Sequence, residues 1–396
     1  MNGYIYADCA ATTPVRQEVL DAMLPYFSDK FTNPSGLYDP SFACKVKLEK
    51  TREIIAESLS CKKNEIYFTS GGTESNNWAI CLGMWGKGGT PHVITSKIEH
   101  HSVLDLCEHL SDIGKIELTL LDVTEDGMVD LHQLESSIKN NTSLITIMTA
   151  NNEIGTIQHI EEIGKIALKY GITFHTDAVQ AYGHIRIPVS EYGISMLSAS
   201  AHKFNGPKGI GFIYISKEID KKPLLYGGGQ ESGLRAGTEN VPSIIGMGEA
   251  ARISYLELDK THEIVRAKRD VLIKRLSFEI EGAYVNGGLD NRLSNNINLS
   301  FEGVISSKLI NYMNKKGVCA SSGSACNSTS LVPSHVLKAI GRSDELALGA
   351  LRLTIDSNLT DEQLDRIQAI PCDNATNRYY SWCNKTRRPK SEQNKR

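Results

Sequence analysis

Short apolar segments alternate with amphipathic helical patterns through roughly the first 250 residues, and this alternation constrains the fold more than any other feature of the chain. We expect strands at 65–69, 92–95, 116–121, 144–149, 173–176, 195–198 and 211–215. Helical patterns lie between them at 46–59, 75–83, 102–110, 131–139 and 160–170. Several strands are almost continuously apolar, which is typical of a sheet covered on both faces. The alternation therefore predicts an α/β fold with a mainly parallel sheet flanked by helices.

The rhythm changes after a glycine-rich loop that opens at 227–229. One long helix is expected at 241–276, followed by a strand at 295–301 and helices at 305–315 and 334–340, which is an α+β pattern. We therefore predict three parts: a large domain at 15–255, a smaller domain made of 1–14 and 256–370, and a basic, disordered tail at 371–396.

The composition is that of a globular protein. The chain has 396 residues, of which 40% are hydrophobic, and its formal net charge is −3. This near-neutral charge argues against a general nucleic-acid-binding protein. The tail at 371–396 holds seven Lys/Arg and two acidic residues, which leaves −8 on the rest of the chain. A basic tail of this kind either stays solvated or docks an acidic acceptor protein or a nucleic acid.

Several protein classes are disfavoured by what the sequence lacks. No run approaches the roughly 18 apolar residues that a membrane span requires, and the N-terminal segment does not have the pattern of a signal peptide. The nine cysteines are irregularly spaced, unlike a disulfide framework, and no C-x-x-C or H-E-x-x-H motif suggests a metal site. We expect a cytoplasmic protein without a metal.

Lys203 follows an expected strand, among small residues and beside His202. A lysine there suits covalent bonding to a carbonyl compound if burial or a neighbouring cation lowers its pKa. The alternative for Lys203 alone is a solvated loop lysine, because most lysines lie at protein surfaces.

Two further segments are consistent with a cofactor site. Asp177 lies at the carboxyl end of an expected strand, the edge where open α/β sheets bind ligands, although the same residue type also begins helices. Gly71 and Gly72 form a turn between a strand and a helix, and Thr73 follows with a hydroxyl. Backbone N–H groups at such a helix start bind anions. A glycine pair alone is weak evidence, but the three segments together indicate a phosphate-bearing cofactor.

The chain resembles the cysteine desulfurases of the class-V aminotransferase family over about residues 4–370. The resemblance rests on seven motifs in family order: Gly71-Gly-Thr-Glu-Ser-Asn-Asn, Glu99-His100, Asn151-Asn-Glu-Ile-Gly, His175-Thr-Asp-Ala-Val-Gln, Ser200-Ala-His-Lys, Arg235-Ala-Gly-Thr-Glu-Asn and Ser321-Ser-Gly-Ser-Ala-Cys. It implies the fold of a fold-type I transferase that depends on pyridoxal 5'-phosphate (PLP).

The resemblance also implies roles for residues around PLP. Lys203 would carry the cofactor, Asp177 would bind its pyridinium nitrogen, and Gln180 would hydrogen-bond its phenolic oxygen. His100 would stack on the ring and shuttle protons. The residues that would hold the phosphate are Gly72, Thr73, Ser200, His202 and, from the partner subunit of a homodimer, Thr238.

L-cysteine is the substrate that the resemblance implies. Asn152 and Arg352 would bind it, and the planar fork of an arginine suits a carboxylate. Cys326 would attack the substrate sulfur, keep it as a persulfide, release alanine, and pass the sulfur to an acceptor protein in iron–sulfur cluster assembly or thio-modification. The attacking species is a thiolate, and His100 is the candidate base.

Some positions depart from the family pattern. Ser232 stands where relatives commonly carry Arg, and the residues around Arg352 differ from the usual Ser-x-Arg-Phe-Ser-Leu-Gly. Neither departure removes a reacting group. A selenocysteine lyase or cysteine-sulfinate desulfinase stays an alternative, as does a catalytically silent dimeric scaffold. A dinucleotide oxidoreductase is disfavoured, because no G-x-G-x-x-G lies on an early strand–helix turn.

Overall fold

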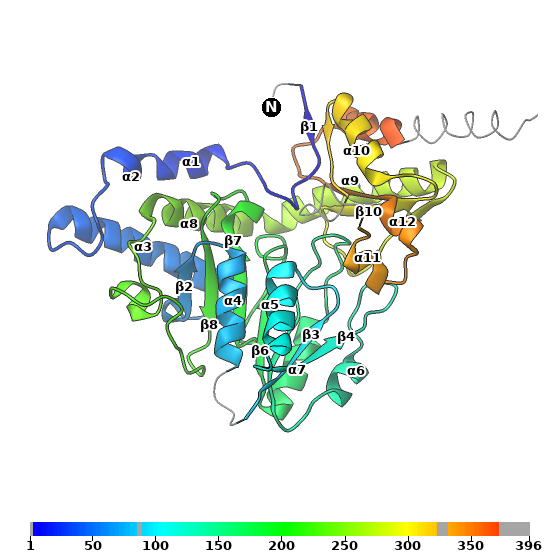
Figure 1. Ribbon diagram of the computed structural model, residues 1–396. Coiled ribbons are helices and arrows are strands. Elements are labelled where there is room, and N and C mark those ends of the chain that lie inside the picture. The colour runs from blue at the N-terminus through cyan, green and yellow to red at the C-terminus, as the bar shows by residue number, and fades with distance from the viewer. Residues whose placement is uncertain (1–2, 85–88, 323–331, 372–396) are drawn as a thin grey trace, which may run out of the picture.

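A seven-stranded sheet lies at the centre of the computed structural model, which describes residues 3–84, 89–322 and 332–371 (Figure 1). Neighbouring strands are parallel, except that β8 runs antiparallel to β2 and β7 on its two sides. The predicted mainly parallel sheet is confirmed. In spatial order the strands are β2 (Ile66–Thr69), β8 (Gly211–Ile215), β7 (Met196–Ser200), β6 (Thr173–Asp177), β5 (Thr142–Thr146), β3 (His92–Ser96) and β4 (Glu117–Leu121).

Helices cover both faces of this sheet, as Figure 1 shows. Successive side chains of a strand point to opposite faces. Accordingly Val93 and Leu144 belong to one apolar cluster, with side chains of α4 and α5. Their neighbours Ile94 and Ile145 belong to another, with side chains of α3, α7 and α8. The helices are α3 (Asp39–Ser58), α4 (Gly72–Gly83), α5 (His101–Asp112), α7 (Ile160–Tyr170) and α8 (Val241–Leu256).

The single helix predicted at 241–276 is wrong, because two helices meet at Glu257. This residue ends α8 and precedes α9 (Leu258–Glu279), with φ −96° and ψ −1°. Met247 on α8 packs in the core beneath the large sheet, whereas Leu272 on α9 packs in a second core. Glu257 thus separates a helix that packs in one core from a helix that packs in the other. Arg16 donates to the Glu257 carboxylate at 2.7 Å, beside the break.

A smaller antiparallel sheet forms the second core. Its central strand is β10 (Asn296–Phe301), between β12 (Ala350–Thr354) and β9 (Ala283–Val285). The N-terminal strand β1 (Ile5–Tyr6) joins this part by pairing in parallel with β11 (Val318–Cys319). The apolar side chains of this part form a cluster separate from those around the large sheet, and the domain division stays a prediction.

Shorter elements complete the described chain. Helix α3 begins at Asp39 instead of at 46, because Tyr38 is extended and Pro40 suits the first turn of a helix. No helix among the described residues has the length and apolar character to cross a bilayer. The remaining elements are α1 (Gln17–Met23), α2 (Pro25–Ser28), η1 (Lys63–Glu65), α6 (Leu131–Ser136), η2 (Ala201–Lys203), η3 (Gln230–Gly233), α10 (Ser306–Lys315), α11 (His335–Ala339) and α12 (Asp344–Leu348).

Candidate active site

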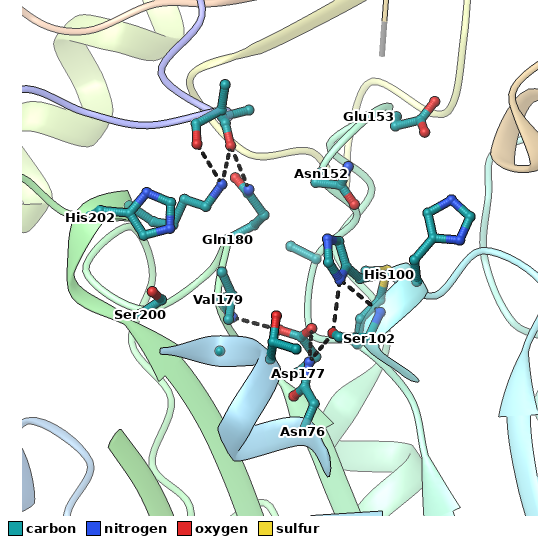
Figure 2. Close-up of a pocket in the computed structure, with 18 of the residues that line it drawn as sticks. Asn76, His100, Ser102, Asn152, Glu153, Asp177, Val179, Gln180, Ser200 and His202 are labelled. Atoms are coloured by element: carbon teal, nitrogen blue, oxygen red, sulfur yellow. Dashed lines mark hydrogen bonds between the residues drawn. The ribbon is translucent and has the colours of Figure 1, made fainter. Parts of the chain in front are cut away.

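A cavity of about 290 Å³ lies at the carboxyl edge of the large sheet, where β6 and β7 end and α4 and α5 begin. This is the edge at which open α/β sheets bind ligands. Its volume is close to the lower end of the range of about 300–1,000 Å³ that is typical of small-molecule sites. Side chains predicted from distant motifs converge around it, as Figure 2 shows for five of them: His100, Asn152, Asp177, Gln180 and Ser200.

Lys203 lines the cavity from η2, the short helix that directly follows β7. Its Nζ donates to the backbone carbonyl oxygens of Ala10 at 2.5 Å and Ala11 at 2.9 Å. These carbonyls belong to the segment that follows β1. Gln180 Nε2 donates to the same Ala10 oxygen at 3.0 Å. The N-terminal segment therefore holds two of the predicted cofactor-binding side chains in place.

Asp177 ends β6, and its side chain lies at the floor of the cavity with 4% of the residue exposed. Oδ1 accepts the backbone N–H of Val179 at 2.9 Å, and Oδ2 accepts Asn76 Nδ2 at 2.7 Å. Both carboxylate oxygens thus receive a hydrogen bond. A buried carboxylate at this place suits a cationic ring nitrogen.

His100 caps the N-terminus of α5, and Nδ1 accepts the backbone N–H of Ser102 at 3.1 Å. The Ser102 hydroxyl also lies 2.8 Å from Nδ1. Burial lowers the pKa of His100; among the nearby charges, the Asp177 carboxylate opposes this shift and the Lys203 ammonium adds to it. The net result is a histidine that is neutral near pH 7.

The N-terminus of α4 forms the wall predicted to bind phosphate. Gly72, Thr73, Ser200 and His202 all line the cavity there. The first N–H groups of a helix have no partner within it and attract anions. A Cβ on Gly72 would lie only 2.5 Å from Cγ2 of Val179, so the close approach of the chain requires glycine. Burial and the nearby Lys203 lower the pKa of His202 to about 4, which leaves it neutral.

Arg352 reaches the cavity from β12 of the smaller sheet and is 2% exposed. Its Nη2 donates to Asp8 Oδ1 at 2.8 Å, and Nη1 donates to the backbone oxygen of Asn152 at 3.1 Å. Asn152 also lines the cavity, so the two predicted substrate-binding residues are in direct contact.

Among the described residues, one predicted residue does not line the cavity. Thr238 is exposed, in the segment after η3. Three residues before it, Arg235 makes a two-pronged ion pair with Glu74 of α4, at 2.8 and 3.1 Å. Cys326 lies outside the described residues, as do the other residues of 323–331.

The described residues on either side of 323–331 contact the walls of the cavity. Ser321 exchanges two backbone hydrogen bonds with Arg352, at 2.7 and 3.1 Å. On the other side, the Ser334 hydroxyl donates to Glu153 Oε2 at 2.6 Å. Glu153 is itself among the lining residues.

Sequence reasoning missed several polar residues of the site. Asn76 lies in the quoted Gly71–Asn77 motif, and Ser102 follows His100 at the spacing of an N-cap, so both had a local signal. Asp8 and His335 had none, because they meet the cavity only through the tertiary fold.

The described cysteines do not have the environment of a reactive thiol. Cys9, Cys61, Cys107 and Cys319 all have their pKa raised, and burial is the largest cause in each case. For Cys61 and Cys107 the pKa rises to about 12. Such thiols stay protonated at neutral pH, consistent with structural roles.

Known proteins of one family resemble this chain over most of its length. The profile of the Aminotransferase class-V family matches residues 5–367. A protein named "Cysteine desulfurase IscS" from Dictyoglomus turgidum is 48% identical, covering 92% of this chain and 93% of the relative. The relative of the same name from Methanosarcina thermophila is also 48% identical, with 93% and 91% covered. Among solved structures, a "NIFS-LIKE PROTEIN" superimposes with a TM-score of 0.88 at 34% identity, covering 94% of this chain and 99% of that one.

Proposed function

The chain belongs to the class-V aminotransferase family as a PLP-dependent cysteine desulfurase, and from this premise we propose which of its residues perform the reaction. Cysteine desulfurases convert L-cysteine to L-alanine and keep the sulfur as a persulfide. The observation that carries the assignment of residues is that Lys203 and Asp177 line one cavity at the carboxyl edge of the sheet. An amine and a buried carboxylate there meet the two chemical demands of PLP, an aldehyde and a ring nitrogen.

The residues of the cavity fit PLP. When bound, PLP supplies an aldehyde that bonds to amines and an electron-withdrawing ring that acidifies the neighbouring C–H group. Lys203 is the proposed attachment point, and Asp177 keeps the ring nitrogen protonated. Gln180 hydrogen-bonds the ring oxygen. The remaining proposed contacts, to the phosphate, come from the α4 N-terminus and the β7 end: Gly72, Thr73, Ser200 and His202.

Arg352 and Asn152 are the proposed binding residues for the substrate carboxylate. The guanidinium is almost fully buried, so the cavity excludes water from the ion pair that it would form. His100 lies on the same cavity and is a proposed catalytic residue.

Cys326 is the proposed acceptor of the sulfur. Its thiolate attacks the substrate sulfur, an S–S bond forms, and the Cβ–S bond breaks. The electron pair of the broken bond stays with the carbon, which takes up a proton to give alanine. The contacts of Ser321 and Ser334 with the cavity walls support this assignment, because they bring both ends of 323–331 to the site.

We also propose a homodimer in which Thr238 contacts the phosphate bound by the partner subunit. Exposed apolar side chains on and between α1, α2 and α3 support an interface, because patches of this kind mark association sites. They include Leu24, Phe27, Phe31, Leu37, Tyr38 and Phe42. The proposed destination of the sulfur is an acceptor protein of iron–sulfur cluster assembly in the cytoplasm, to which the name IscS of the relatives points. A thio-modification enzyme is the other proposed acceptor.

The decisive experiment incubates the holoenzyme with L-cysteine and a dithiol reductant and measures alanine and sulfide. We expect equal yields, because the dithiol releases each persulfide sulfur as sulfide and is itself oxidised. Cys326→Ser should form neither product, while Cys81→Ser, at a cysteine that does not line the cavity, should match the wild type. Full alanine formation by Cys326→Ser would refute its role and favour a lyase or desulfinase. No product from the wild type would refute the proposed function.

A further inference from the structure

We propose that Asn76 and Ser102 are positioning residues that fix which ring nitrogen of His100 carries the proton. They form a chain of hydrogen bonds from Asp177 to His100, drawn as dashed lines in Figure 2. The donors and acceptors of these bonds allow only one arrangement, in which His100 Nδ1 is unprotonated and the ring proton is on Nε2. His100 therefore meets the substrate as a hydrogen-bond donor.

The chain of hydrogen bonds passes through the side-chain amide of Asn76, a residue that is 1% exposed. Its Nδ2 lies 2.7 Å from Asp177 Oδ2 and 2.8 Å from Ser102 Oγ. The opposite amide orientation would place an oxygen against the carboxylate, so both amide protons are donated to these two oxygens. Within the described structure, Asn76 Oδ1 is buried without a hydrogen-bond partner. This orientation is thus set by the two acceptors and not by the amide oxygen.

The order of donors and acceptors continues through Ser102. Because its Oγ accepts a hydrogen bond from Asn76, its own hydroxyl hydrogen is directed to His100 Nδ1, 2.8 Å away. The backbone N–H of Ser102 donates to the same nitrogen at 3.1 Å. A backbone N–H has no lone pair to offer, so Nδ1 must be an acceptor. A neutral imidazole then carries its proton on Nε2.

This arrangement limits what His100 does in the reaction. The charged and titratable groups that act on it are Asp177, Lys203, His101 and His335, and the net effect with burial is a lowered pKa. To take up a proton, the ring must use Nδ1 and lose the cap of α5. The Nε2–H group is free of that constraint and would donate to an anionic acceptor. The identification of this acceptor as the sulfur of cysteine rests on the proposed function. The assignment of the His100 tautomer does not rest on it.

The tautomer is directly measurable by NMR on the holoenzyme labelled with ¹⁵N-histidine. Correlations between ring nitrogens and carbon-bound ring protons distinguish an unprotonated Nδ1 from a protonated one, and His100→Gln identifies the signal. We expect the Nε2–H form at pH 7. A proton on Nδ1, or a cationic ring at that pH, would overturn the proposal. The measurement needs no turnover, so absence of alanine formation would count against the proposed function alone.

Variants then test the role of the chain. Ser102→Ala removes one donor to Nδ1, which makes that nitrogen more basic, and the His100 pKa should rise by about 0.5–1 pH unit. Ser102→Thr keeps the hydroxyl and should restore the wild-type titration. Asn77→Ala is the matched control, because Asn77 donates to the backbone oxygen of Ser102 and not into the chain. An unchanged His100 titration in Ser102→Ala, or an equal shift in Asn77→Ala, would refute the role of the hydroxyl.

Discussion

Replacing Asp8 with Asn tests whether the guanidinium of Arg352 is held ready for a substrate carboxylate. The pair is short, at 2.8 Å, and Arg352 is 2% exposed, whereas 18% of the Asp8 side chain is exposed. Asn keeps a neutral acceptor at nearly the same place. The hydrogen bond to the charged guanidinium is kept, and what the change removes is the attraction between two opposite charges, which for a partly exposed pair is about 1 kcal/mol.

The weaker Asp8–Arg352 interaction should lower the stability of the free protein but strengthen the binding of substrate. In the absence of cysteine, the unfolding free energy of Asp8→Asn should fall by about 1 kcal/mol, because the buried cation has a weaker partner. With cysteine, the substrate carboxylate no longer competes with Asp8 for Arg352. The KM should therefore fall by roughly five-fold, the ratio that corresponds to about 1 kcal/mol.

Urea unfolding and the steady-state rate of alanine formation measure the two effects. Asp361→Asn, an exposed aspartate, is the matched control and should leave both unchanged. If the KM of Asp8→Asn rises or stays constant while stability is lost, Asp8 does not compete with the substrate carboxylate for Arg352. Asp8 would then serve only to hold the arginine.

Three further substitutions follow from the geometry. Gly72→Ala should weaken PLP binding at least ten-fold, because the new Cβ would lie 2.5 Å from Cγ2 of Val179. Gly229→Ala is the control and should not weaken it, because the space around its new Cβ is open. Equal PLP affinities of the two variants would contradict the steric argument. Burial raises the pKa of Glu99 to about 8. The folded state therefore keeps a proton that the unfolded state loses above about pH 4.3. The free energy of unfolding should fall as the pH rises from about 4.3 to 8. Glu99→Gln should remove this slope and raise the unfolding free energy at pH 7 by about 1–3 kcal/mol; destabilisation would show that the ionised form is needed. Burial lowers the pKa of His175 to about 3, so stability should decline below about pH 6.5 as the unfolded state gains the proton, by up to about 1.4 kcal/mol per pH unit. His175→Gln should reduce this decline, and an unchanged slope would assign it to other groups.

Much of the fold and the site was predictable because their signals are local. Several strands of the large sheet are short apolar runs, and parallel strands bring their carboxyl ends to one edge. Asp177 and Lys203 follow two such strands, so their approach to one cavity follows from the chain order. The seven short motifs supplied the proposed roles, which geometry alone would not assign.

What the sequence did not reveal depends on tertiary contacts. Asp8 and Arg352 are 344 positions apart, and no local pattern relates them. The break at Glu257 has no adjacent proline or glycine that would have marked it in the sequence. The orientation of Asn76 likewise depends on a carboxylate 101 positions away.

The contacts of Ser321 and Ser334 have a consequence for how this site tolerates change. Each is bonded to a residue of the cavity wall, Ser321 to Arg352 and Ser334 to Glu153. Both flanks of 323–331 are thus anchored on the chamber wall. A segment transplanted from a relative that keeps Cys326 and these two serines should leave the chamber intact, so delivery of sulfur to different recipients can diversify without rebuilding the chemistry.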